Sequence, residues 1–270
     1  MRYYSGVPDF DPLIAAVPSE IPLRNAPLVR VIAQLRFPLV IAIQQRDFVA
    51  PFQEAIRKSY PVLRQEQVQG MVLAPPNLPI AVPPTTVWRF SDTSGDWRVS
   101  LAPEFLALET TKYSSRTDFL SRLQQVVRAL AEHVEPEVID RLGVRYIDRI
   151  TVDSVDEISR LVRPEVLGFI ASKAATHLQH SLSESVFAVN DNRLLARWGT
   201  LPPNATYDPA ALEAVPQRSW VLDLDLFREK PQRFAVDELL MEAKQFAERI
   251  YAVFRWAVTP EFLRRHGGET

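Results

Sequence analysis

The stretch SWVLDLDLF (219–227), followed by DELLMEAKQFAERIYAVFRWAV (237–258), decides the fold. Apolar and acidic residues alternate in the first stretch, which is typical of a β-strand with one apolar face. That face contains Trp220, Leu222, Leu224 and Leu226, and the other face contains Asp223 and Asp225. In the second stretch apolar residues recur every three or four positions, which predicts a long amphipathic helix with Asp237 as its N-cap.

The first half of the chain repeats this plan. The stretch TDFLSRLQQVVRALAEHV (117–134) predicts a second long helix with Thr117 as N-cap. A shorter helix is predicted at 47–60, and another at 156–170 that Pro164 interrupts. Apolar and β-branched runs predict strands at 28–37, 67–73, 86–91, 97–101, 105–111, 142–152, 178–189, 193–199 and 219–227.

The order β-α-β-β-β-(β)-α thus occurs twice, with a boundary near 135–141. Consecutive strands favour antiparallel pairing with helices on one face. We therefore expect an α+β fold in which repeats 28–135 and 136–270 form a curved antiparallel sheet with two long helices packed on one face. This topology resembles the TATA-box-binding-protein-like fold, although a fold does not by itself carry a function.

Proline is abundant (22 residues) and glycine scarce (8 residues), and the prolines cluster in three segments. Residues 1–27 are predicted to form an extended N-terminal arm. Segments 74–84 and 202–216 are predicted to be stiff loops without regular structure. All three segments are natural elements for contact with a protein partner.

Composition and motifs exclude several classes of protein. The net charge of −2 argues against a constitutive nucleic-acid binder, and the lack of cysteine excludes disulfides and thiolate-bound metals. No signal peptide or run of ~18 apolar residues is visible, so we expect a cytoplasmic protein without a membrane span. G-x-G-x-x-G, P-loop and G-x-S-x-G motifs are absent, so we expect no cofactor and favour a binding protein over an enzyme.

Asp223 and Asp225 are the candidate metal ligands, because alternate strand positions place both carboxylates on one face. With Glu109 or Asp148 they could serve a metal-dependent hydrolase or nuclease. The alternative interpretation is the solvated face of a half-exposed strand.

The candidate nucleic-acid-binding residues are Arg89, Arg98, Arg145 and Arg197, because they lie on strands that also carry Trp or Tyr. The alternative interpretation pairs the strand arginines with Glu109, Asp148, Asp223 and Asp225 across neighbouring strands.

Several runs resemble a known pattern: LRNAPLVRVIAQLRFP (23–38), WRFSD…DWRVSLAPEFLALETTKY (88–113), RLGVRYIDRI (141–150) and YAVFRWAVTPE (251–261). Together they are similar to a sporadically distributed bacterial family of about this length with no assigned biochemical function. A patchy distribution implies a mobile defence or toxin–antitoxin type operon. The leading hypothesis is therefore a non-catalytic interaction protein, a regulatory or neutralising component with a protein partner or a second copy of itself.

Overall fold

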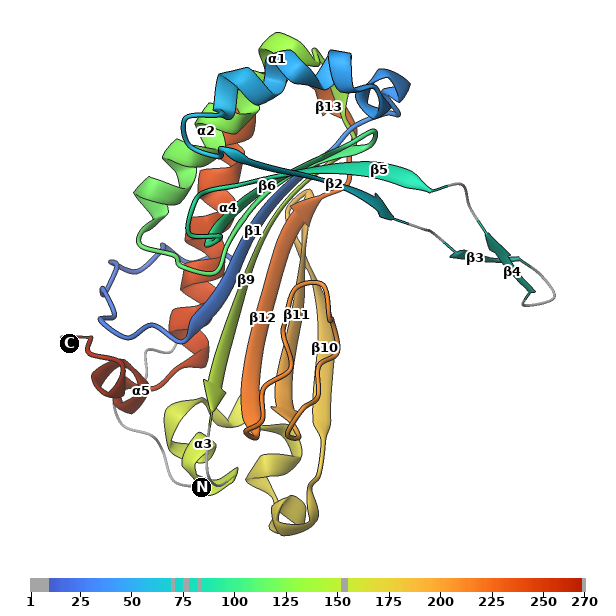
Figure 1. Ribbon diagram of the computed structural model, residues 1–270. Coiled ribbons are helices and arrows are strands. Elements are labelled where there is room, and N and C mark those ends of the chain that lie inside the picture. Colours follow the sequence, from blue (N-terminus) through green and yellow to red (C-terminus); the bar gives the residue numbers. More distant parts are fainter. Residues whose placement is uncertain (1–9, 69–70, 75–77, 82–83, 152–154, 269–270) are drawn as a thin grey trace. The chain divides into compact units, whose positions relative to one another are not determined.

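The computed structural model describes residues 10–68, 71–74, 78–81, 84–151 and 155–268. The fold is mixed α+β with antiparallel strand pairing, as predicted (Figure 1). The chain divides into two compact units. Unit 1 comprises Met1–Val31, Val144–Phe227 and Gln245–Thr270, and unit 2 comprises Ile32–Gly143 and Arg228–Lys244. No helix among the described residues is long and apolar enough to cross a bilayer.

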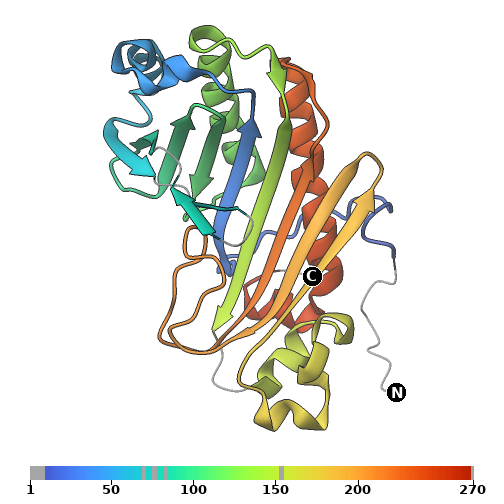
Figure 2. The ribbon, with the colours of Figure 1, turned by 90° about the vertical axis from the view of Figure 1, so that its right-hand side faces the viewer.

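The sheet of unit 1 has the strand order β10-β11-β12-β9-β1 (Figures 1 and 2). Its strands are β10 (Ser181–Val189), β11 (Asn192–Leu201), β12 (Ser219–Arg228), and the unit 1 parts of β9 (Arg141–Thr151) and β1 (Leu28–Arg36). Gly199 permits the close pairing of β10 with β11. A Cβ atom at this position would lie 2.0 Å from the carbonyl oxygen of Ser181, so no other residue fits.

The alternation in β12 is confirmed on its apolar side. Trp220, Leu222, Leu224 and Leu226 are all buried. The long helix α4 (Val236–Ala257) follows as predicted, but Asp237 lies in its first turn and is not its N-cap. A short helix that the sequence did not indicate, α5 (Pro260–Arg265), begins directly afterwards. The hydroxyl of Thr259 caps α5 by accepting a hydrogen bond from the backbone N–H of Phe262 at 3.2 Å.

Pro164 interrupts the predicted helix of unit 1, because proline lacks the N–H that a helix interior requires. Helix α3 (Val155–Leu161) ends before it, and three 3₁₀ turns follow: η2 (Pro164–Val166), η3 (Gly168–Ala171) and η4 (Lys173–His177). Residues 10–27 contain no helix or strand and are held by side chains of α4. Arg249 donates to the carbonyl oxygens of Pro12 and Ala15.

The sheet of unit 2 has the strand order β1-β7-β6-β5-β2. Its further strands are β2 (Val62–Val68), β5 (Thr85–Ser91), β6 (Trp97–Ala102) and β7 (Phe105–Thr110). The strand predicted at 67–73 falls across two strands, because it overlaps the end of β2 and the first three residues of a further strand at Met71–Ala74; residues 69–70 lie outside the described residues. β2 is a mostly exposed edge strand whose position is set by pairing with β5. Its sequence, VLRQEQV, offers little apolar alternation to locate it.

Part of the proline-rich segment 74–84 is regular, contrary to the prediction. Strand β3 (Met71–Ala74) pairs with β4 (Leu78–Ala81) in a separate two-stranded sheet. Pro79 lies within β4. A two-stranded sheet consists only of edges, where a residue without an N–H can be accommodated. Sequence periodicity did not indicate this pairing.

The core of unit 2 forms between its sheet and two helices, α1 (Arg46–Ile56) and α2 (Arg116–His133) (Figure 1). The rings of Phe52 on α1 and Phe90 on β5 lie 5.7 Å apart. Trp88 donates to the carbonyl oxygen of Ile43 at 2.7 Å, in the 3₁₀ turn η1 (Ile41–Gln44). The N-cap of α2 is Ser115 and not Thr117, because the hydroxyl of Ser115 accepts the backbone N–H of Asp118. Strands β8 (Val138–Ile139) and β13 (Gln232–Arg233) form a further short pair.

Candidate functional site

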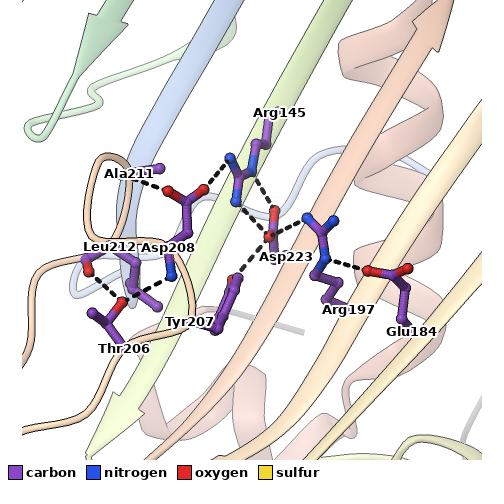
Figure 3. A network of polar contacts seen from close by, with 9 residues as sticks. All are labelled: Arg145, Glu184, Arg197, Thr206, Tyr207, Asp208, Ala211, Leu212 and Asp223. Carbon is purple, nitrogen blue, oxygen red and sulfur yellow. Dashed lines mark hydrogen bonds and ion pairs between the residues drawn. The ribbon is translucent and has the colours of Figure 1, made fainter. Parts of the chain in front are cut away.

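Four strands of unit 1 bring charged side chains together on one face of the sheet (Figure 3). Arg197 of β11 lies directly opposite Asp223 of β12, and Glu184 of β10 lies directly opposite Arg197. Arg145 extends from β9 to the same aspartate. Directly opposed residues share a face of a sheet, so the strand register itself assembles this cluster.

Asp223 is the centre of the cluster. Arg145 binds its carboxylate with both ends of the guanidinium, Nε to Oδ1 at 2.8 Å and Nη2 to Oδ2 at 2.7 Å. The hydroxyl of Tyr207 donates to Oδ2 at 2.8 Å, and Nη1 of Arg197 lies 3.6 Å from the same oxygen. The side chain of Asp223 is only 1% exposed. The interpretation of this residue as part of a solvated face is therefore wrong, since segment 202–216 covers it.

Segment 202–216 is anchored to the sheet through Asp208 and Tyr207. The carboxylate of Asp208 accepts from Nη1 of Arg145 at 2.8 Å, so a single arginine holds one aspartate on the strand and one on the segment. Within the segment, Thr206 donates to the carbonyl oxygen of Leu212 at 2.6 Å, and Leu212 is buried. As predicted, the segment contains no helix or strand. Its internal bonds nevertheless give it a defined conformation.

The ionisation of these groups follows from burial and pairing. Burial alone would lower the pKa of Arg145, but its hydrogen bonds and its attraction to Asp223 and Asp208 outweigh burial and raise it. Burial raises the pKa of Tyr207, and the charge of Asp223 and the hydrogen bond to it add to this effect. Burial would raise the pKa of Asp208, but the bond to Arg145 lowers it overall. At neutral pH Arg145 and Asp208 are therefore charged, and Tyr207 is neutral.

A second arginine lies beneath the same segment. Arg149 of β9 is 8% exposed and donates through Nη1 to the carbonyl oxygen of Glu213 at 2.6 Å. Its Nε and Nη2 are buried and have no hydrogen-bond partner among the described residues. Burial lowers the pKa of Arg149. Arg30 of β1 approaches the carboxylate of Glu213 at 4.0 Å, so acidic groups of the segment face basic groups of the sheet.

Asp148 of β9 has a carboxyl pKa that lies in the physiological range. It is 6% exposed, and burial raises its pKa to about 7. The negative charge of Asp223 contributes in the same direction. Asp148 therefore titrates near neutral pH, whereas an exposed aspartate would be fully ionised there.

The structure separates the predicted site residues. Arg145, Arg197 and Asp223 meet in the cluster, and Asp225 lies two residues further along β12, half-buried. Arg89 and Arg98 belong to unit 2. Each of these two arginines contacts a carboxylate on a neighbouring strand: Arg89 reaches Glu66 at 2.7 Å, and Arg98 forms a close ion pair with Glu109.

This geometry adds no support to the predicted metal site or to the predicted nucleic-acid interface. Within the described ranges no group of three or more Asp, Glu, His or Cys residues could hold a metal ion. Around Asp223, arginine and tyrosine donors occupy positions that a cation would need. The four predicted arginines each contact a carboxylate, which is the cross-strand pairing that the sequence left open.

The sequence did not identify Tyr207, Asp208 or Arg149 as members of the cluster. Tyr207 and Asp208 lie in the proline-rich segment, where no periodicity assigns a side chain to a surface. Two features of the sequence could have indicated that Asp223 is covered. Asp223 shares a strand with apolar neighbours, and a long segment able to cover it precedes that strand. Periodicity alone does not say which segment does so.

Comparison with known proteins adds no functional assignment. No protein-family model matches the chain, and no curated protein shows significant similarity to it. The resemblance to a sporadically distributed bacterial family therefore stays a prediction.

Unit 2 contains a cavity of about 330 Å³, which is large enough for a small ligand. Two arginines and three carboxylates contribute to its walls beside a few apolar residues. Arg36 lies 3.8 Å from Glu104, and Arg141 lies 4.0 Å from Glu229, so each arginine of the lining faces a carboxylate and the formal charge of the lining is negative. The lining residues are Arg36, Phe37, Pro38, Leu39, Glu104, Asp140, Arg141 and Glu229.

Proposed function

We propose that this chain is a non-catalytic binding protein whose contact loop for a protein partner is segment 202–216. One observation carries the proposal: Arg145 simultaneously binds Asp223 on the sheet and Asp208 on the segment (Figure 3). A loop fixed in this way is held in one conformation before any partner arrives. Ordering a loop on binding costs affinity, so a preorganised loop binds more tightly than a flexible one.

The energetics of the cluster support a positioning role. Burying a charged pair costs free energy that its own attraction repays only when the geometry is good, so such a pair is weak evidence of a stabilising role. Here the bidentate geometry of Arg145 and Asp223 meets that condition, and the additional bond to Asp208 ties down the loop. Small and proline residues then face outward, which suits a rigid contact surface. They are Pro203, Asn204, Pro209, Ala210, Ala214 and Pro216, and the acidic side chain of Glu213 is exposed beside them.

The pairing within the cluster argues against a hydrolase as its primary role. A metal site at Asp223 and Asp225 would require a cation to displace Arg145 from Asp223. Calorimetric titration with a divalent cation tests this alternative directly, because no heat of binding at millimolar metal would remove it. Nucleic-acid binding through Arg145 and Arg197 would likewise require these arginines to leave their carboxylates. It predicts salt-sensitive binding to DNA or RNA.

The contact loop can be tested with one substitution and a matched control. Asp208→Asn weakens the anchor of the segment, and Asp118→Asn removes a similar ion pair with Arg122 on α2, in the other unit. Immobilised protein is exposed to an extract of the source organism, and retained proteins are identified by mass spectrometry. Hydrogen exchange then locates the residues that the partner protects.

We expect a retained partner that protects segment 202–216 and binds Asp208→Asn at least about tenfold more weakly, with Asp118→Asn unaffected. Protection that lies entirely outside the segment would contradict the contact loop. Metal-dependent hydrolytic activity lost on substitution of Asp223 would contradict the non-catalytic assignment.

The remaining expectations from the sequence stand as part of this proposal. We propose that the fold is a duplicated β-α-β-β-β-(β)-α plan with two long helices on one face. We also propose that it is similar to the TATA-box-binding-protein-like fold. A regulatory or neutralising role in a mobile defence or toxin–antitoxin type operon follows from the family resemblance alone. A cytoplasmic location is proposed on the composition.

A further inference from the structure

Strand β10 forms the outer edge of the unit 1 sheet (Figure 1). It pairs with β11 over nine consecutive residues, from Ser181 opposite Thr200 to Val189 opposite Asn192. No bulge interrupts this register. On its other side β10 has no strand neighbour within the part of the chain that the structure describes. A regular row of backbone N–H and C=O groups is therefore open to another strand.

This edge lacks the features that usually prevent strand addition. Natural edge strands are protected by lysine, proline, bulges or short length, and β10 has none of these. Its only charged side chain, Glu184, is paired with Arg197 of its own chain at 2.6 Å. Val186 is 61% exposed and Phe187 is 38% exposed. An edge that is long, unprotected and apolar from Val186 to Val189 is typical of a surface that another strand covers.

The hairpin geometry identifies the backbone groups that point outward. Only Asn190 and Asp191 connect β10 to β11, so Val189 and Asn192 form the hydrogen-bonded pair that closes the turn. Hydrogen-bonded and non-hydrogen-bonded pairs alternate along an antiparallel ladder. Counting back from Val189, the outward N–H and C=O groups belong to the even positions of the strand, which are Leu182, Glu184, Val186 and Ala188.

The outward backbone groups at these positions can pair with those of β10 in a second copy of the chain. Ser185 is the midpoint of Ser181–Val189, so a two-fold axis through Ser185 overlaps the two strands completely. Leu182 then lies opposite Ala188 of the second copy, and Glu184 lies opposite Val186 of the second copy. No like charges are directly opposed. Moving the axis by one residue to Glu184 would place the two glutamates opposite each other, which is unfavourable.

We propose that β10 pairs with β10 of a second copy of this chain in antiparallel orientation about a two-fold axis at Ser185. The unit 1 sheets of the two copies then form one continuous sheet. Such an isologous contact is the commonest way in which identical chains associate. This inference concerns a different surface from segment 202–216 and does not depend on it.

Four substitutions in the full-length chain test both the contact and its register. Val186→Pro removes an outward N–H that the second copy would use, while β11 does not need that N–H. Ser185→Lys places two lysines opposite each other on the axis. Val186→Lys places each lysine opposite Glu184 of the second copy. Met241→Lys is the matched control, because Met241 on α4 is also 61% exposed.

Sedimentation equilibrium over a range of concentrations gives the dimer dissociation constant, and circular dichroism checks that each variant is folded. We expect a wild-type dimer whose dissociation constant rises at least about tenfold in Val186→Pro and Ser185→Lys. Val186→Lys and Met241→Lys should keep the wild-type constant or lower it. A wild-type chain that stays monomeric would overturn the proposal, and so would a dimer that folded Val186→Pro leaves intact. A dimer lost equally in Ser185→Lys and Val186→Lys would overturn the register.

Discussion

Replacing Asp148 with asparagine should change how the stability of the protein depends on pH. Burial raises the pKa of Asp148 from 3.8 to about 7 in the folded protein. Between these values the native state binds a proton that the unfolded state has released. The contribution of Asp148 to the free energy of unfolding therefore falls as the pH rises from about 4 to about 7, and is constant above that.

The size of the effect follows from the shift. Each pKa unit corresponds to about 1.4 kcal/mol, so a shift of roughly three units costs the folded protein about 4 kcal/mol above pH 7. Between pH 5 and pH 8 the loss is about 3 kcal/mol, since about two of those units lie within this range. Asparagine has nearly the same shape and no charge. Any packing cost of the substitution is independent of pH and cancels in the comparison.

The assay is chemical denaturation of wild type and Asp148→Asn at pH 5 and pH 8. The stability of the variant relative to wild type should be higher at pH 8 than at pH 5 by about 3 kcal/mol. Asp191→Asn, an exposed aspartate in the turn between β10 and β11, is the control and should show no such difference. Parallel pH profiles for wild type and Asp148→Asn would refute the reasoning, because they would mean that Asp148 is ionised in both states at pH 5.

Further predictions concern the cluster and the core. Asp223→Asn removes the buried bidentate partner of Arg145 and leaves Asp208 as its remaining carboxylate, and it should lower the free energy of unfolding by about 3 kcal/mol in urea denaturation; a loss below 1 kcal/mol would contradict this. Asp208→Asn should cost only about 1 kcal/mol but accelerate hydrogen exchange in segment 202–216, and unchanged exchange would mean that other contacts hold the segment. Phe52→Ala leaves a cavity beside Phe90 in unit 2 and should cost about 3 to 5 kcal/mol, a prediction that a thermal shift of only a degree or two would contradict. Ser115→Ala removes the N-cap of α2 and should cost about 1 kcal/mol in the same measurement, whereas Thr117→Ala should cost less.

The elements with strong local periodicity were predictable from the sequence. The alternation of 219–227 specifies strand β12, and the stripe of 237–258 specifies helix α4, because both patterns depend on the geometry of a single element. The interruption at Pro164 is equally local, since the missing N–H of proline acts within one turn. Weaker patterns were misplaced by a few residues. Strand β2 is polar and exposed, and the cap of α2 depends on which of two neighbouring hydroxyls meets a backbone N–H.

The candidate site could be predicted from the sequence only in part. Alternation placed Asp223 opposite the buried leucines but could not say whether water or protein covers it. Segment 202–216 covers Asp223 in the structure, and it contributes Tyr207 and Asp208 from outside any regular element. The same long-range packing buries Asp148 and leaves β10 at an edge. The sequence thus determined which residues share a face, because that depends on the period of one strand. Only the tertiary structure decided what lies against each face, because that depends on contacts between segments far apart in the chain.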